Sequence, residues 1–190
     1  MKRNKKIAVT GGIGSGKSLF CDILKSMGYE VFSCDEIYAE MLREEEYLAL
    51  LKARFPDCFV GGSLDKKRLS ERVFGCAEDR KALDDLAHPI VMQRLLAKME
   101  GKTAFAEVPL LFEGGYEGLF DCVIAIVRSN EERVKSVMAR SHLTEDEVLS
   151  RIKNQFDPTL LSSKNCIIVE NNGSKEDLEK QAKGIAEQLI

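Results

Sequence analysis

Short apolar runs alternate along this chain with segments whose apolar residues recur every three or four positions. The runs have the length and the apolar content of buried strands, and they cover residues 7–9, 29–34, 103–108, 121–127 and 166–170. The segments between and after them have helical spacing, most clearly over 83–99 and 174–188. This alternation predicts an α/β fold with a parallel sheet of about five strands and helices on both faces.

The long stretch between residues 36 and 100 shows no strand pattern and predicts a helical insertion. Pro89 lies inside its strongest apolar stripe, so we expect a kink or a helix boundary there. Further along, Ser129 and Thr144 each begin a capping-box sequence. These two signals predict a pair of short helices, which end near Arg140 and Phe156.

The most specific motif lies between the first strand and the first helix. Gly11, Gly16, Lys17 and Ser18 match the phosphate-binding pattern G-x-x-x-x-G-K-[ST]. Glycines let successive N–H groups point inward, the lysine supplies a mobile charge for the β- and γ-phosphates, and the serine hydroxyl is a Mg²⁺ ligand. An ordinary glycine-rich turn is the alternative, but the complete motif follows an apolar strand and precedes a helix. We expect Ser18 to be the metal ligand, and the nucleotide-binding residues to be Gly12, Ile13, Gly14, Ser15, Gly16, Lys17 and Ser18.

Two carboxylates follow strands and are candidates for chemistry near the phosphates. Asp35 ends the second strand, where it can orient an attacking hydroxyl or accept its proton. Its alternative role is to cap the next helix, and the two roles are compatible. Glu107 ends the third strand and could approach Mg²⁺ through water.

The paired helices after the fourth strand have the charge and the size of a mobile lid. They carry Arg133, Arg140 and Arg151, and phosphoryl transfer needs positive charge over the phosphate oxygens. Ordinary surface arginines are the alternative, and Arg140, near the turn between the helices, is our choice. His142 in that turn is expected to be exposed, and His88, on spacing alone, is expected to be structural.

Composition narrows the function classes. The chain has 190 residues and a net charge of −3, which suits one soluble domain and gives no support for a nucleic-acid or membrane surface. Six cysteines without a C-x-x-C pair predict reduced thiols in the cytoplasm. No segment has the pattern of a signal peptide or a membrane span. A GTPase is disfavoured because the D-x-x-G and N-K-x-D motifs are absent, which leaves a small kinase.

These features resemble the dephospho-CoA kinase family over nearly the whole chain. The matching segments are Thr10–Ser18, Cys34–Asp35, Leu86–Ile90, Val108–Glu113, Met138–Arg140, Arg151–Gln155 and Glu170–Gly173. The resemblance implies a three-layer P-loop NTPase fold and transfer of the ATP γ-phosphoryl group to the ribose 3′-hydroxyl of dephospho-CoA. It implies Asp35, Lys17 and Arg140 as catalytic residues, Asp35, His88 and Glu107 as substrate-binding residues, and ATP with Mg²⁺.

The same resemblance implies one kinase domain made of three parts. The nucleotide-binding core covers about 1–35, 101–128 and 160–190, the acceptor region for dephospho-CoA covers about 36–100, and the lid covers about 129–158. We expect small-molecule substrates only, with no nucleic acid or membrane partner, and a monomer or a weak homo-oligomer.

Several positions depart from the family pattern, namely Leu19, Ser33, Arg133, Ser136 and the segment after Gln155. Two alternatives therefore stay open. The first is a nucleoside or nucleoside-monophosphate kinase, which would share the fold. The second is a nucleotide-binding regulator without transfer activity, against which Asp35 argues.

Overall fold

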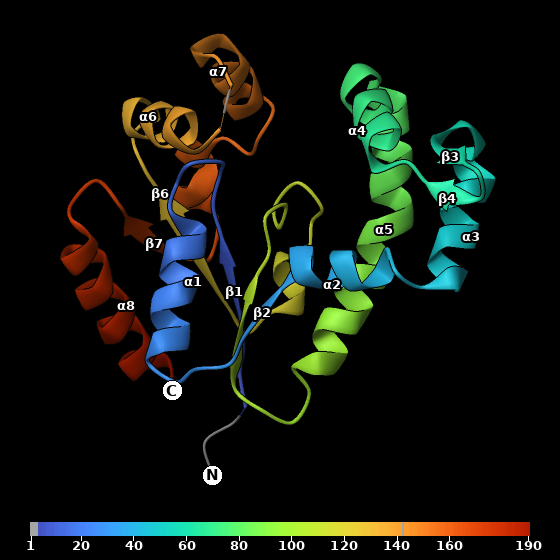
Figure 1. The fold of residues 1–190 in the computed structure, drawn as a ribbon. Helices are drawn as coiled ribbons and strands as arrows, with labels where there is room; N and C mark the ends of the chain where they lie inside the picture. The colour runs from blue at the N-terminus through green and yellow to red at the C-terminus, as the bar shows by residue number, and fades with distance from the viewer. Residues whose placement is uncertain (1–3, 142) are drawn as a thin grey trace. The chain divides into compact units, whose positions relative to one another are not determined.

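The computed structural model describes residues 4–141 and 143–190, so the expectation for His142 lies outside the described residues. Backbone contacts divide the chain into two units. The first unit consists of Met1–Ser33 and Lys98–Ile190, and the second consists of Cys34–Ala97 (Figure 1).

A five-stranded parallel sheet forms the centre of the first unit. Its strands are β1 (Lys6–Thr10), β2 (Val31–Ser33), β5 (Ala104–Glu107), β6 (Cys122–Val127) and β7 (Ile167–Glu170). The order β2-β5-β1-β6-β7 places β1 in the middle, so the loop that follows β1 is flanked by the ends of β5 and β6. The predicted fold class is confirmed, although β2 is shorter than predicted because Cys34 already belongs to a helix.

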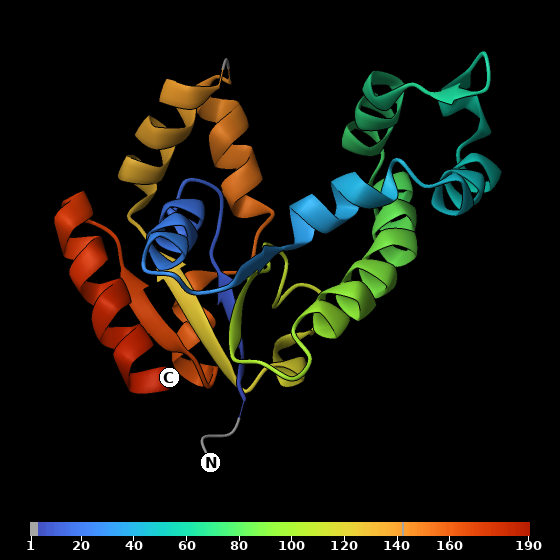
Figure 2. The same cartoon turned by 60° about the horizontal axis from the view of Figure 1, so that its bottom comes forward.

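Side chains of β1 alternate between the two faces of the sheet, as the period of a strand requires. Ile7 and Val9 join an apolar cluster with the helices α1 (Lys17–Ser26) and α8 (Lys175–Leu189), which cover one face side by side (Figure 2). Ala8 is equally buried and points to the opposite face. The short helical turns of the unit are η2 (Glu117–Leu119) and η3 (Pro158–Ser163).

The predicted pair of short helices is present as α6 (Asn130–Arg140) and α7 (Glu145–Lys153). They have a small core of their own made of Val134, Val137 and Val148, and Ile13 of the glycine-rich loop packs against it. The predicted capping box of α7 is confirmed, because the side chains of Thr144 and Glu147 each accept from the other's backbone N–H. Helix α7 ends before the predicted boundary at Phe156.

The capping box predicted for α6 is only half formed. The Ser129 hydroxyl accepts from the Glu132 N–H, but the Glu132 carboxylate pairs with Arg128 and Lys135 instead of returning to Ser129. The Ser129 N–H donates to the Asn172 side-chain oxygen at 2.9 Å. A side chain from beyond β7 therefore replaces the local bond that the sequence predicts.

The second unit is mostly helical. Its elements are α2 (Cys34–Met41), α3 (Glu45–Arg54), η1 (Pro56–Cys58), β3 (Phe59–Val60), β4 (Ser63–Leu64), α4 (Lys66–Gly75) and α5 (Ala77–Lys98). The expectation that no strand occurs here is wrong, since β3 and β4 form an antiparallel hairpin. Gly61 and Gly62, with φ of +58° and +86°, supply the left-handed pair that such a two-residue turn needs.

Pro89 lies inside α5, so the expected helix boundary is not found there. Proline removes one backbone hydrogen bond, but Ala87 and Val91 on either side of it are buried. Packing of these neighbours keeps the segment helical. Among the described residues, no helix combines the length and the apolarity that crossing a bilayer requires.

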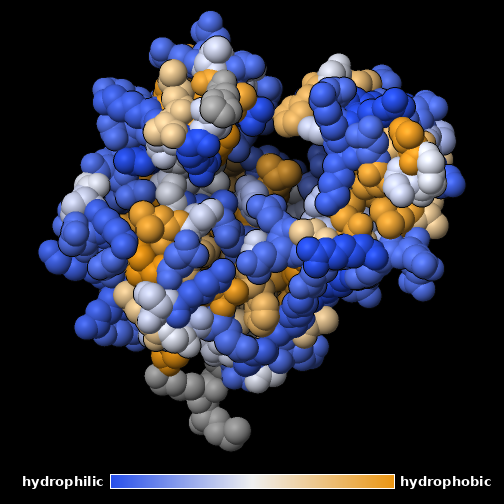
Figure 3. Space-filling view, in the orientation of Figure 1, coloured by the Kyte–Doolittle hydropathy of each residue, from blue (hydrophilic) through white to orange (hydrophobic). Residues whose placement is uncertain are grey.

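The face of the molecule drawn in Figure 3 is largely hydrophilic, with an apolar area over α1. Leu19 and Met27 on this helix are each 37% exposed. Leu19, one of the departures from the family pattern, therefore lies on the surface and not in the core.

Candidate functional site

The glycine-rich loop between β1 and α1 adopts a conformation that needs its glycines. Gly14 and Gly16 have φ of +75° and +92°, and the Ser15 N–H donates to the Gly12 carbonyl at 3.1 Å. Helix α1 begins at Lys17, so its positive end faces the loop. The Ser15 hydroxyl is buried and has no hydrogen-bond partner in the described part of the chain. Such a cradle, with an unused hydroxyl, fits a bound polyphosphate.

Glu107 brings together the two side chains that follow the loop. Its Oε1 lies 2.8 Å from the Lys17 Nζ and accepts the Ser18 hydroxyl at 2.8 Å. Burial raises the pKa of the Glu107 carboxyl, but the charge of Lys17 and the hydrogen bonds from Lys17 and Ser18 outweigh burial and hold the pKa below its ordinary value. The Ser18 and Glu107 oxygens are the hard donors that Mg²⁺ prefers, and Mg²⁺ needs few protein ligands when phosphates and water complete its shell.

The lowered pKa of Glu107 predicts a stability effect at acid pH. The ionised form is favoured by folding, so its contribution is complete above the ordinary glutamate pKa of about 4.3 and is lost as pH falls through the lower pKa of the folded state. Glu107→Gln is expected to flatten the decline of unfolding free energy between roughly pH 5 and pH 3. Urea unfolding across this range measures it, and an unchanged decline would contradict the assignment.

Arg133 and Gln155 bind both backbone polar groups of Ile13, its N–H and its carbonyl. The Arg133 Nε donates to the Ile13 carbonyl at 2.8 Å, and the Ile13 N–H donates to the Gln155 Oε1 at 2.9 Å. The Arg133 Nη2 donates to the same Gln155 oxygen at 2.9 Å. Helix α6 and the segment after α7 are therefore tied to the backbone of the phosphate loop, at a point where a side chain on Gly12 would collide with the guanidinium.

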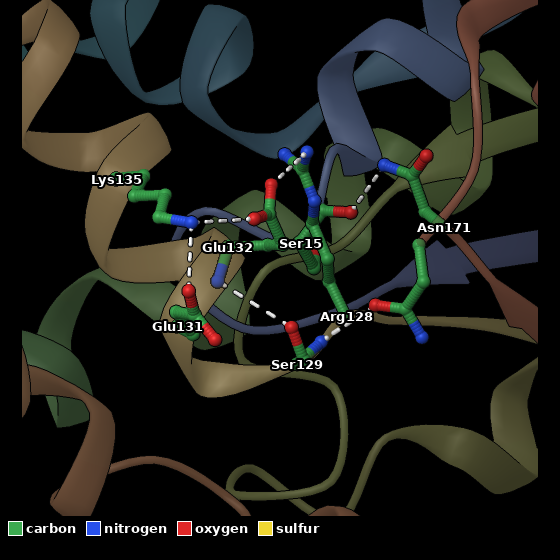
Figure 4. Close-up of polar contacts among 8 residues, drawn as sticks. Ser15, Arg128, Ser129, Glu131, Glu132, Lys135 and Asn171 are labelled. Carbon is green, nitrogen blue, oxygen red and sulfur yellow. Dashed lines mark hydrogen bonds and ion pairs between the residues drawn. The ribbon is translucent and has the colours of Figure 1, made fainter.

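A second support reaches the loop from the end of β7. The Asn171 Nδ2 donates to the Ser15 carbonyl at 2.8 Å, and the side chain is buried. Figure 4 shows this bond beside the contacts of Arg128 with Glu132 and of Lys135 with both neighbouring glutamates. A Cβ on Gly16 would lie 2.1 Å from the Asn171 Nδ2, so the loop and this asparagine fit only with glycine at that position.

Gly16→Ala is expected to weaken nucleotide binding and to destabilise the fold more than Gly28→Ala. Both glycines flank α1 with similar φ, +92° and +88°, so alanine costs about 1–2 kcal/mol of backbone strain at either site. Only at Gly16 does the new methyl meet another atom within 4 Å, the Asn171 amide. Thermal unfolding and ATP titration of both variants test this, and equal losses in the two would refute the steric argument.

Beside the start of the loop, a small hollow opens at the carboxyl ends of the strands. It is lined by the start of the loop at Thr10–Gly12, by Glu113 and by aromatic side chains that include Phe112 and Phe156. The two rings lie 4.6 Å apart, and the Glu113 Oε1 accepts the Phe156 N–H at 2.8 Å. Glu113 thus serves as a turn cap, and its loop forms one wall of the hollow.

Comparison with known proteins identifies the family. The dephospho-CoA kinase family model matches residues 5–177. A dephospho-CoA kinase of Thermus thermophilus is 40% identical over 188 residues, which cover 96% of this chain and 91% of the relative. One from Geobacillus kaustophilus is 31% identical and covers 96% of this chain and 95% of that protein. The chain belongs to the dephospho-CoA kinase family.

Solved structures agree with the dephospho-CoA kinase assignment. The crystal structure of TT1252 from Thermus thermophilus has a TM-score of 0.85 at 39% identity, with all of both chains covered. A dephospho-CoA kinase from Campylobacter jejuni has a TM-score of 0.72 at 28% identity and covers 98% of both chains. A gluconokinase from Sinorhizobium meliloti, at 13% identity and a TM-score of 0.54, shares the fold alone. This chain is therefore a P-loop kinase, and its family carries out the last step of coenzyme A biosynthesis.

The structure places the predicted site residues of this dephospho-CoA kinase family member in different elements. It brings Glu107 together with Lys17 and Ser18. Asp35 lies in the first turn of α2, two residues after β2 ends, and Arg140 is the last residue of α6. These positions leave the catalytic roles of Asp35 and Arg140 as predictions.

His88 belongs to α5 of the second unit. Its Nε2 lies 3.4 Å from the Asp84 Oδ1, one turn earlier on the same helix. Burial raises the pKa of Asp84, and the nearby His88 and Arg80 oppose that rise. The pairing shows that this histidine has a local partner, and its role at the acceptor site also stays a prediction.

Three residues that contact the loop were not selected from the sequence as functional, namely Arg133, Gln155 and Asn171. Gln155 and Asn171 lie in segments that carry the family resemblance, which is a usable signal. Arg133 is one of three arginines that the sequence offers for the paired helices, but nothing in its spacing distinguishes a buried arginine from a surface one. The structure makes this distinction, because Arg133 is only 4% exposed.

Proposed function

We propose that this protein transfers the γ-phosphoryl group of ATP to the ribose 3′-hydroxyl of dephospho-CoA, giving coenzyme A and ADP. The observation that carries the proposal is the contact of Glu107 with both Lys17 and Ser18 beside the glycine cradle. It joins a cation for the phosphates and two oxygen ligands for a metal at the end of β5. Family membership supplies the acceptor.

In this proposal the loop residues 12–18 bind ATP through their N–H groups, and Lys17 neutralises charge on the transferred phosphoryl group. Ser18 would hold Mg²⁺ directly, and Glu107 would reach the ion through a water molecule. A Mg²⁺ ion held there would supply positive charge that offsets the negative charge of the phosphates, which otherwise repels an attacking hydroxyl. The chain's own contribution is to position these groups before the substrates arrive.

The acceptor side of the proposal rests on Asp35 and His88. We infer that Asp35 accepts the proton of the 3′-hydroxyl or holds that hydroxyl in line, and that His88 contacts dephospho-CoA. Arg140, at the end of α6, is the proposed lid arginine for the phosphate oxygens. Residues 36–100 act as the acceptor region, and residues 129–158 act as the lid.

The expected setting is the cytoplasm, where both small-molecule substrates occur, with no nucleic acid or membrane as a partner. The net charge of −3, which gives no attraction to polyanions, supports the absence of such partners. A monomer or a weak homo-oligomer is the expected state, and sedimentation analysis is the measurement that determines it.

An ADP-release assay with ATP and Mg²⁺ tests the acceptor directly. Dephospho-CoA is compared with a panel of nucleosides and nucleoside monophosphates under the same conditions. Release with dephospho-CoA alone is the expected result. Release with a nucleotide but not with dephospho-CoA would establish the alternative kinase, and ATP binding without release for any acceptor would favour a regulator.

A further inference from the structure

Arg133 is a buried cation without a counter-charge. The residue is 4% exposed, and burial lowers the pKa of its guanidinium. Its hydrogen bonds go to the Ile13 carbonyl, to the Gln155 side-chain oxygen and, at 3.3 Å, to the Asn130 side-chain oxygen. All three acceptors are neutral, and within residues 4–141 and 143–190 no carboxylate forms an ion pair with this side chain.

The carboxylates closest in sequence are engaged elsewhere. Glu132 pairs with Arg128 at 3.3 Å, and Glu131 pairs with Lys135 at 2.7 Å (Figure 4). Neither neutralises Arg133. A buried charge that lacks a partner is unfavourable, and a neutral amide could donate to the Ile13 carbonyl at lower cost. The hydrogen bonds alone therefore do not account for an arginine here.

The position of Arg133 identifies the missing counter-charge. A Cβ built on Gly12 would lie 2.3 Å from the Arg133 Nη2, so the guanidinium sits directly against the loop backbone. The loop presents its N–H groups to phosphates, which makes a polyphosphate the nearest anion that this cation can face. In a site with little water, a fixed charge acts more strongly than one on the surface.

We infer that Arg133 is an electrostatic positioning residue for the nucleotide phosphates, held in place by Gln155. Three hydrogen-bond acceptors hold the Arg133 side chain before the nucleotide binds, whereas Lys17 has a flexible side chain. The Arg133 side chain therefore loses little conformational freedom on binding. Arg133 acts through its charge and through the Ile13 peptide, and no contact with a reacting atom is required. The inference rests on the proposed function in one respect, that the loop holds the phosphates of a nucleotide.

The test separates charge from hydrogen bonding. Arg133→Gln removes the charge but keeps an N–H donor on a side chain that can reach the Ile13 carbonyl. Arg133→Lys keeps the charge with a single donor group. Lys135→Gln removes a positive charge from the exposed surface of the same helix and is the matched control. Calorimetric titration of each protein with inorganic tripolyphosphate, ATP, ADP and AMP gives the affinities without any turnover.

Arg133→Gln is expected to lower the affinity for tripolyphosphate and ATP about 10-fold, because the attraction grows with phosphate charge. The affinity for ADP should fall less, and the affinity for AMP hardly at all. Arg133→Lys should stay within about threefold of the wild type, and Lys135→Gln should not differ from it. The melting temperature of Arg133→Gln without nucleotide should be equal to or above that of the wild type, since a buried charge is removed.

Unchanged tripolyphosphate affinity in Arg133→Gln would overturn the inference, as would an equal loss in Arg133→Lys or an equal loss for AMP. If Arg133→Gln does not fold, the inference is tested by Arg133→Lys and by the salt dependence of wild-type tripolyphosphate binding. A loss of tripolyphosphate affinity in Arg133→Lys would then overturn the inference. Wild-type protein that binds no polyphosphate would overturn the proposed function and the inference together. If the wild-type protein binds polyphosphate but releases ADP with an acceptor other than dephospho-CoA, the proposed function alone would be overturned.

Discussion

Replacing Lys17 with alanine is expected to lower turnover by at least roughly 10³-fold, to the limit of detection. The substitution removes the cation that follows the transferred phosphoryl group. It also leaves the buried Glu107 carboxylate with Ser18 as its remaining hydrogen-bond donor in the described chain. Steady-state ADP release with ATP, Mg²⁺ and dephospho-CoA measures the loss.

The orphaned carboxylate makes a control necessary, because a destabilised protein would also lose activity. Lys17→Ala combined with Glu107→Gln removes the unpaired charge and should recover the melting temperature while turnover stays absent. Recovered turnover in the double variant would show that Lys17 matters for stability and not for phosphoryl transfer.

Asp35→Asn is expected to cut turnover at least roughly 10²-fold, the scale of a lost general base, and to leave ATP affinity nearly unchanged. The amide keeps the size of the side chain but cannot accept the proton of the acceptor hydroxyl. Turnover and ATP titration measured on the same preparation separate the two effects.

Glu36→Gln is the matched control for Asp35→Asn. Both residues lie in the first turn of α2, so both substitutions remove a negative charge from the same helix terminus. Only the change at Asp35 should affect turnover. Near-normal turnover in Asp35→Asn, or an equal loss in Glu36→Gln, would remove Asp35 from the mechanism.

The sheet and the phosphate loop could be predicted because their signals are local. Each strand is a short apolar run, and Gly11 to Ser18 form a complete motif between a strand and a helix. The carboxyl ends of parallel strands meet at one edge, so Glu107 could be placed near the loop from its position alone. Its contacts with Lys17 and Ser18 agree with that reasoning.

The hairpin of β3 and β4 was missed for a different physical reason. Each strand has only two residues, Phe59–Val60 and Ser63–Leu64, which is too short for a period of two to appear. The Gly61–Gly62 pair is compatible with an ordinary loop, but a glycine pair is also one of the two-residue signals for a tight hairpin. The formation of such a short hairpin depends more on the residues of its turn than on the residues of its strands.

The supports of the phosphate loop were missed because their contacts are remote in sequence. Arg133 reaches Ile13 across 120 positions, and Gln155 reaches it across 142. No periodicity or spacing rule connects residues so far apart. Whether an arginine is exposed or buried is decided by the fold around it, so the structure was needed to distinguish Arg133 from Arg140.

The bond from Asn171 to Ser15 spans 156 positions, and it sets an order of events during biosynthesis. The ribosome makes the loop early and the asparagine that holds it roughly 8 to 30 s later, at ordinary rates of elongation. Gln155 arrives only shortly before Asn171. A growing chain therefore carries the phosphate motif without its supports for most of its synthesis. The bond from Asn171 therefore cannot contribute to the folding of the first half of the chain while that half is being made.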